Sequence, residues 1–511
     1  MNWQFLLLTS LSLSIGWGIR GQFGHEYGAA MAGALACLAV AVLSGREDWH
    51  RRAAYFAVFG AIGFAFGGSM SYMKVVAYTH SPEWDTTLYG FANMWLLGFL
   101  WSAPGGAGCA LPAYLKREDL TEFFLPLSAV SIGWLARDIL VDIFHPLRFQ
   151  GVGVVVPVIA VLVLALIRRR IDMGSRLVIY LCAGWWAGML LFVNVLGLHM
   201  SPPRDDGWAG CVGLVAALLV FCARNGLAGV AFATLCTGLL GGSGFALAAA
   251  IKHIGISTGL VTNWHSVMEQ TDGLMFGLSL AVAMGMLSRR APRVSDDPPV
   301  RRWTDAYSVM FVLWLLTYLN FRFSPSEWLT EVTTLKPWLY GIAVESGFIP
   351  SRGFLGWFDI AYLAMGAAMG LLLYWHLKRG MALVPSTWMG RAQLLYLVFL
   401  WMQVMINFTH VLPRFSERRL VTEWVIALNA AVCTILMCSG TFSQPDRTAG
   451  AVAQDRSYAP WIRTTVLGGA IGAVAIILSS WGIKQALFGE RPVPNSAVHI
   501  RFGPNNDNTT R

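Results

Sequence analysis

Long apolar runs that contain no charged residue constrain this chain more than any other feature. Residues 152–167, 180–195 and 466–481 are three such runs. A helix needs about 20 mostly apolar residues to cross the hydrocarbon core of a bilayer, where only helices and closed barrels satisfy every backbone hydrogen bond. Charged residues make up 13% of the 511, against about 25% in a typical soluble protein. The sequence therefore predicts an all-α, polytopic integral membrane protein surrounded by the lipid bilayer.

Apolar segments of this kind recur along the whole chain and predict a bundle of about 15 transmembrane helices. The N-terminus has no basic segment and no small-residue cleavage site, so we expect the first helix to be retained. The predicted spans are residues 3–20, 27–45, 53–75, 87–104, 122–144, 152–168, 178–197, 207–223, 227–251, 272–288, 303–320, 356–377, 391–410, 420–439 and 463–484.

Basic residues gather in the loops that follow every second predicted helix. The largest groups lie at residues 46–52, 168–176 and 289–302. Cytoplasmic loops of membrane proteins are enriched in Lys and Arg, so these groups predict a cytoplasmic N-terminus and a multi-pass location in the cell (inner) membrane. Topology thereby accounts for the net charge of +9, and no nucleic-acid partner is indicated.

Some positions occur twice at a nearly constant spacing. Gly60 and Lys74 recur as Gly238 and Lys252, 178 residues later in the chain. Six predicted helices separate the copies, and an even number gives both copies the same orientation. Parallel repeats build many transporters, and the six-plus-six arrangement is similar, in topology alone, to that of major-facilitator transporters. The predicted domains are six-helix repeats at residues 1–176 and 177–379, a C-terminal three-helix appendix at 380–489 and a polar tail at 490–511.

The first candidate site is a polar, glycine-rich stretch at residues 18–28, between two apolar segments. Four glycines let the backbone approach a ligand closely, and Arg20, His25 and Glu26 supply the polar groups. Charged residues at membrane depth usually face a bundle interior or an aqueous cavity. These three residues are predicted to bind substrate. The alternative is an ordinary turn with a helix-capping acid.

The second candidate is the repeated basic pair, Lys74 and Lys252. The two side chains could converge between the repeats to hold an anionic group, with Glu26 and Asp206 as countercharges in the empty site. The alternative is that each lysine extends its ammonium group to the lipid head groups, as terminal lysines usually do.

The third candidate is a stripe of Asp138, Asp142 and His145, spaced i, i+4, i+7 on one helical face. Two carboxylates and an imidazole suit a divalent cation, a proton relay or acid–base chemistry. No other metal site and no cofactor are predicted. The alternative is an ion pair between Arg137 and one of the carboxylates.

The fourth candidate is the segment 252–272, in which Trp264 and His265 lie beside further polar residues. Indole and imidazole groups suit a sugar face or a lipid head group. The alternative for Trp264 is an interfacial anchor.

Together these features favour a secondary transporter of a small polar or anionic solute, with its polar site toward the extracytoplasmic side. The alternative is an integral-membrane transferase or hydrolase that acts on a lipid-linked sugar or acyl group at the outer leaflet. A third reading is a membrane scaffold, in which the polar residues pair only with each other. The chain has no Walker A, His-Glu-x-x-His or Gly-x-Ser-x-Gly motif, which disfavours ATP-driven transport by this chain alone.

Overall fold

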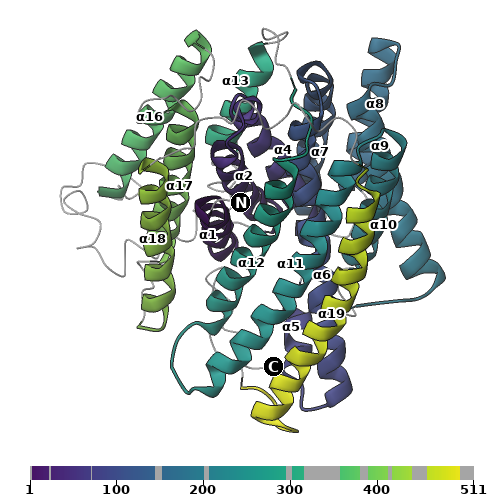
Figure 1. Cartoon of the computed structure of the whole chain (residues 1–511), viewed down its shortest axis with the longest axis vertical. Helices are drawn as coiled ribbons and strands as arrows, with labels where there is room; N and C mark the ends of the chain where they lie inside the picture. Colours follow the sequence, from purple (N-terminus) through teal and green to yellow (C-terminus); the bar gives the residue numbers. More distant parts are fainter. Residues whose placement is uncertain are drawn as a thin grey trace.

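The computed structural model describes residues 3–21, 25–70, 72–143, 152–200, 206–294, 302–315, 357–379, 390–411, 417–439 and 457–494. Within these ranges every regular element is a helix (Figure 1). The long helices are α1 (Trp3–Arg20), α2 (His25–Leu43), α4 (Ala53–Ala65), α6 (Trp84–Tyr114), α7 (Arg117–Ile143), α8 (Val152–Arg168), α9 (Met173–Gly188), α10 (Gly207–Arg224), α11 (Ala228–Ser257), α12 (Trp264–Leu287), α16 (Trp357–Arg379), α17 (Arg391–Val411), α18 (Glu417–Cys438) and α19 (Ala459–Phe488). The short ones are α3 (Glu47–His50), the 3-10 helix η1 (Phe66–Ser69), α5 (Met73–Thr79), the π-helix η2 (Met189–Val195), α13 (Arg302–Met310) and the π-helix η3 (Phe311–Leu315).

The structure confirms the prediction of an all-helical protein with membrane-spanning segments. It does not confirm the predicted count of about 15 spans or the predicted repeat. Eight helices among the described residues are long and apolar enough to cross a bilayer. They are Glu26–Leu43, Trp84–Tyr114, Met173–Val195, Gly207–Arg224, Ala228–Ser257, Trp264–Leu287, Val421–Cys438 and Ala459–Phe488, with shorter apolar helices at Ala53–Gly68, Val154–Arg168, Ala364–Trp375 and Ala392–Phe408.

The predicted span at residues 53–75 is interrupted after η1, a short helix in which two glycines lie against neighbouring helices. The chain runs through α4 and η1, becomes extended at Met70 and resumes as α5. A Cβ atom on Gly67 would lie 2.8 Å from the Cα of Trp101, and one on Gly68 would lie 2.5 Å from the Cα of Glu26. Only glycine permits such a close approach. The break brings Tyr72, which follows η1, into the interior of the bundle.

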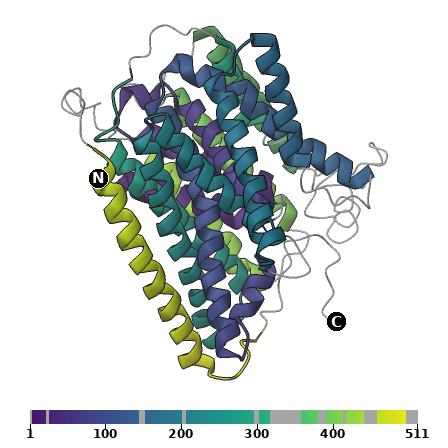
Figure 2. The same cartoon turned by 90° about the vertical axis from the view of Figure 1, so that its right-hand side faces the viewer.

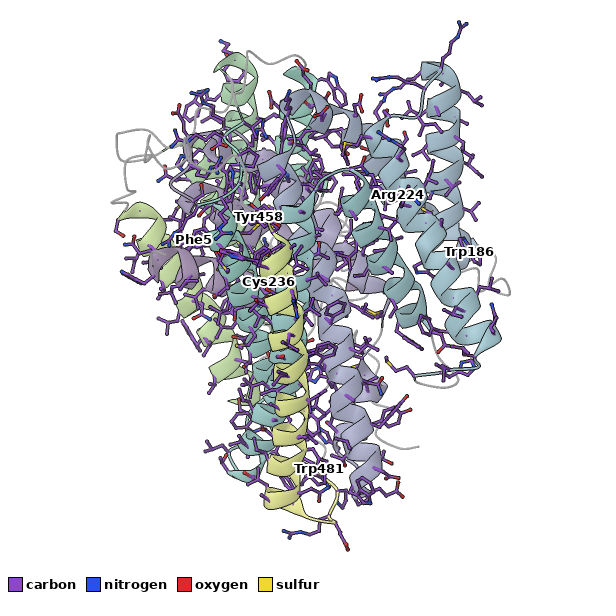
Figure 3. All side chains as sticks on the ribbon, turned by 45° about the vertical axis from the view of Figure 1, so that its right-hand side comes forward. Phe5, Trp186, Arg224, Cys236, Tyr458 and Trp481 are labelled. Atoms are coloured by element: carbon purple, nitrogen blue, oxygen red, sulfur yellow. The ribbon has the colours of Figure 1, made fainter. Side chains whose placement is uncertain are left out.

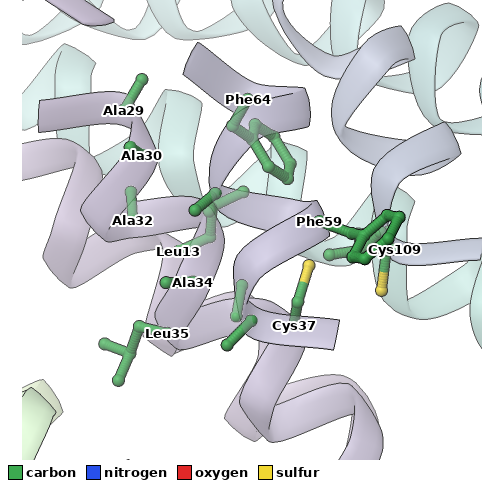
Figure 4. Close-up of a cluster of buried hydrophobic side chains, with 14 of the residues drawn as sticks. Leu13, Ala29, Ala30, Ala32, Ala34, Leu35, Cys37, Phe59, Phe64 and Cys109 are labelled. Atoms are coloured by element: carbon green, nitrogen blue, oxygen red, sulfur yellow. The ribbon is translucent and has the colours of Figure 1, made fainter. Parts of the chain in front are cut away.

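Helix α1 lies inside the bundle, in contact with α2, α12, α17 and α18 (Figure 1). Small residues allow this close packing, as is usual in membranes. A Cβ on Gly273 of α12 would lie 2.5 Å from the Cβ of Trp17, and one on Gly277 would lie 2.6 Å from the Cα of Ser10. Next to α1, Gly33 of α2 lies against Phe64 of α4, and Phe59 of α4 lies beside Cys109 of α6 (Figure 4).

The outer face of the bundle is apolar, as a surface in contact with lipid should be. Trp186, for example, points outward and is 47% exposed (Figure 3). Helix α19 is strongly apolar, and few of its side chains are buried in the bundle. It runs along α11 and α6 on one side of the bundle (Figure 2), whereas α17 and α18 pack against α1. The three helices predicted as a C-terminal appendix thus contact two different parts of the bundle.

The glycines that suggested an internal repeat contact different kinds of neighbour in the two halves. A Cβ on Gly60 would meet Cys37 of α2, whereas one on Gly238 would meet Phe99 of α6. The matched glycines are therefore used for helix contacts in both halves, but against unlike partners. Superposition of the two halves about an axis along the membrane normal stays a prediction.

Candidate functional site

A cluster of charged side chains lies where the end of α1 meets α11 and α12. At its centre is Glu269, which is 1% exposed. One carboxylate oxygen of Glu269, Oε1, lies 3.7 Å from Nη2 of Arg20 and 3.8 Å from Nε2 of His265. The Tyr72 hydroxyl donates a hydrogen bond to the same oxygen. One acid thus joins groups from α1, α12 and the segment after η1.

Helix periodicity brings the α12 members of this cluster onto one face. His265, Glu269 and Asp272 are spaced i, i+4, i+7, so their side chains lie one above another on that face. Asn263 caps the helix, since its side-chain Oδ1 accepts a hydrogen bond 3.1 Å long from the Ser266 amide. Asp138, Asp142 and His145 have the same i, i+4, i+7 spacing in the sequence. The same pattern could therefore have found Glu269 and Asp272, which are absent from the predicted binding residues.

Three aromatic rings enclose the guanidinium of Arg20, which is fully buried. The Cζ atom lies 4.5 Å from the ring centroid of Trp17, 4.8 Å from that of Trp101 and 5.2 Å from that of Tyr72. The negative faces of aromatic rings attract a cation, and more strongly where water is excluded. Glu269 and the three rings therefore hold this positive charge in place inside the bundle.

Other polar groups of the cluster have no hydrogen-bond partner among the described residues. They include the Nζ atom of Lys252, both carboxylate oxygens of Asp272, Oε2 of Glu269 and Oε1 of Gln270. Lys252 is 1% exposed and Asp272 is fully buried. Lys252 interacts electrostatically with Glu269, and Asp272 with both Glu269 and Arg20. A buried charge without hydrogen bonds is costly, so these atoms are the candidate ligand contacts of the cluster.

Three of the predicted binding residues, Arg20, Lys252 and His265, come together around Glu269. Glu26 is partly exposed and lies against Gly68 of η1. The predicted partners His25 and Lys74 belong to α2 and α5, and their side chains are not among those that the structure describes. The same holds for Asp138 and Asp142 of α7, while His145 lies outside the described residues altogether.

The other two predicted binding residues lie elsewhere. Asp206 pairs with His199, with 2.7 Å between Oδ2 and Nδ1. It is the N-cap residue of α10, which contributes no residue to the cluster. The acid that interacts electrostatically with Lys252 is Glu269, whereas the sequence predicted Asp206 as its countercharge. Trp264 packs over Gly255 and its indole donates to the Leu260 carbonyl, 3.0 Å away, so it fastens the loop between α11 and α12.

Further buried polar side chains border the cluster on two sides. On one side the rings of His80 and His253 meet edge to face, with centroids 4.9 Å apart. On the other side the Gln270 amide donates to the Thr422 carbonyl of α18, 3.1 Å away. Beside it the side-chain amide of Asn407 donates to Oε2 of Glu423, 2.5 Å away. Helices α17 and α18 therefore form part of the polar layer around the site.

The described residues contain no group of three or more His, Cys, Asp or Glu side chains arranged to hold a metal ion. No known protein family, curated protein or solved structure matches this chain. The geometry of the buried cluster is therefore the basis for assigning a function.

Proposed function

We propose that this multi-pass membrane protein is a secondary transporter of a small polar solute, which binds at the cluster around Glu269. The observation that carries the proposal is the burial of five ionisable side chains together among apolar helices. Each is at most 5% exposed. Ionisable residues inside a membrane bundle are expensive and generally serve a substrate or ion pathway. The five are Arg20, Lys252, His265, Glu269 and Asp272.

The pattern of unused hydrogen bonds supports binding over a purely structural role. A scaffold gains most when its buried charges pair completely, because each unpaired charge destabilises the fold. Here Lys252 and Asp272 are buried without a hydrogen-bond partner among the described residues. Burial of the whole cluster also favours a transported solute over a lipid-linked substrate, which would need an opening toward the outer leaflet.

Two buried arginines join helices at the opposite end of the bundle, which supports a transporter that opens to one side at a time. Arg46 binds Asp48 through two hydrogen bonds of 2.6 and 2.9 Å, and it donates to the carbonyls of Ala291 and Pro292 beyond the end of α12. Arg52 donates to two carbonyls at the end of α6, 2.6 and 2.8 Å away. The predicted topology assigns this end to the cytoplasm.

Uptake into proteoliposomes tests the proposal. Solutes that raise the apparent melting temperature of the purified protein, by binding only the folded state, would be offered as radiolabelled substrates. We expect accumulation that Glu269→Gln abolishes and Glu47→Gln leaves unchanged, because Glu47 is an exposed acid paired with Arg51. Turnover of a lipid-linked sugar or acyl donor, without movement of any bound solute, would instead establish the enzyme alternative.

A further inference from the structure

We infer that the solute is a small zwitterion, a molecule with one protonated amine and one carboxylate and no net charge. This inference rests on the proposed function, since it concerns the ligand of the same site. It follows from the charge balance of the cluster and from the two kinds of polar group left without a hydrogen bond.

With all four groups ionised, the formal charges of the cluster cancel. Arg20 and Lys252 then carry two positive charges, and Glu269 and Asp272 carry two negative charges, so the sum is 2 − 2 = 0 with His265 neutral. Interactions between charges are several times stronger in a buried site than in water. A solute with a net charge would leave that charge uncompensated after binding. A solute without net charge avoids this cost.

The atoms without a hydrogen bond are of both kinds, donors and acceptors. Lys252 offers three N–H donors at Nζ, while Asp272 offers two acceptor oxygens, Glu269 one and Gln270 one. A simple carboxylate would satisfy Lys252 and leave Asp272 unpaired. A simple amine would do the reverse. A molecule that carries both groups can satisfy both ends of the site, and charge-assisted hydrogen bonds of this type are the strongest available.

A shared neighbour favours a compact solute. Lys252 and Asp272 each interact electrostatically with Glu269, and Asp272 lies three residues beyond Glu269 on α12. Both groups therefore lie near one carboxylate, which favours a small molecule over a long one. Tyr72 and His265 stack with ring centroids 6.0 Å apart and give the site an aromatic wall.

Thermal shift of the full-length protein in detergent tests the class of ligand. The probes are glycine, β-alanine and γ-aminobutyrate, and the matched single-charge compounds are ethylamine and propionate. We expect at least one zwitterion to raise the melting temperature, with an apparent Kd about tenfold or more below that of either single-charge compound, because each of these leaves a buried group unpaired. Stabilisation by propionate or by a neutral polyol, with none from the zwitterions, would overturn the inference. So would the absence of a shift with every zwitterion.

Substitutions of Lys252 and Asp272 test whether the zwitterion binds at the cluster. Lys252→Met should abolish the shift produced by the zwitterion, and Asp272→Asn should remove the preference for zwitterion over propionate. Lys484→Met is the matched control, because Lys484 is also buried but donates to the Gly489 carbonyl and lies near His253, outside the group of charges around Glu269. If the single variants fail to fold, the double variant Lys252→Met/Glu269→Gln keeps the cluster neutral and should fold without binding. Unchanged binding in Lys252→Met or in the double variant would refute the assignment.

Transport is measured separately, so that the two proposals can fail independently. A zwitterion that binds through Lys252 and never accumulates in proteoliposomes would refute transport and leave the ligand class standing. Accumulation of a singly charged solute or a sugar through the Glu269 site would refute the ligand class and leave transport standing.

Discussion

Replacing Glu269 by Gln should destabilise the protein by about 3 kcal/mol, and a second replacement should restore most of the loss. Removal of one partner of a buried ion pair costs about 3–5 kcal/mol, because the other charge is left uncompensated. The distances from the Glu269 carboxylate to Arg20 and His265 are 3.7 and 3.8 Å, longer than hydrogen bonds, and a glutamine can still accept from Tyr72. The lower end of the range therefore applies.

The measurement is reversible unfolding in mixed detergent micelles, with a double-mutant cycle. Lys252→Met in the Glu269→Gln background removes the positive charge that Glu269→Gln leaves unpaired, so the double variant should be only about 1 kcal/mol less stable than the unmodified protein, which corresponds to a coupling free energy of at least about 2 kcal/mol. Glu47→Gln removes an exposed acid and should change stability by less than about 0.5 kcal/mol. Additive effects of the two buried substitutions would show that the cluster is not an electrostatic unit and would refute the reasoning.

Four further outcomes are expected. Arg46→Lys should destabilise the fold by about 1–3 kcal/mol, because lysine cannot reproduce the paired hydrogen bonds of a guanidinium, and chemical unfolding measures the loss. Gly68→Ala should cost about 1–3 kcal/mol through overpacking, since its Cβ would lie 2.5 Å from backbone atoms of Glu26, whereas Gly472→Ala meets nothing within 4 Å and serves as the control. Burial lowers the pKa of His50 from 6.5 to about 4, so the unfolded state takes up the proton first. Stability should therefore fall as the pH drops from about 6.5 to about 4, by up to about 3 kcal/mol, and His50→Gln should flatten that slope. A cysteine introduced at position 293 should resist an impermeant thiol reagent in intact cells, and labelling there would reverse the predicted orientation.

The sequence by itself determined the class of protein and part of the site. Charge-free apolar runs of membrane length leave few alternatives to a helical bundle, because backbone groups in lipid must bond within the segment. Arg20, Lys252 and His265 could be selected because charged or polar residues near the ends of apolar segments require partners. The i, i+4, i+7 spacing of His265, Glu269 and Asp272 could be recognised from the sequence in the same way.

Which helices meet was decided by the tertiary structure alone. In a soluble protein, polar and apolar faces show which side of a helix is buried. In a membrane the lipid-facing side is as apolar as the buried side, so the pattern carries little information about neighbours. Tyr72 reaches Glu269 because helical structure ends after η1, where the backbone becomes extended at Met70. Likewise, contacts between helices far apart in the sequence bring α17 and α18 against α1.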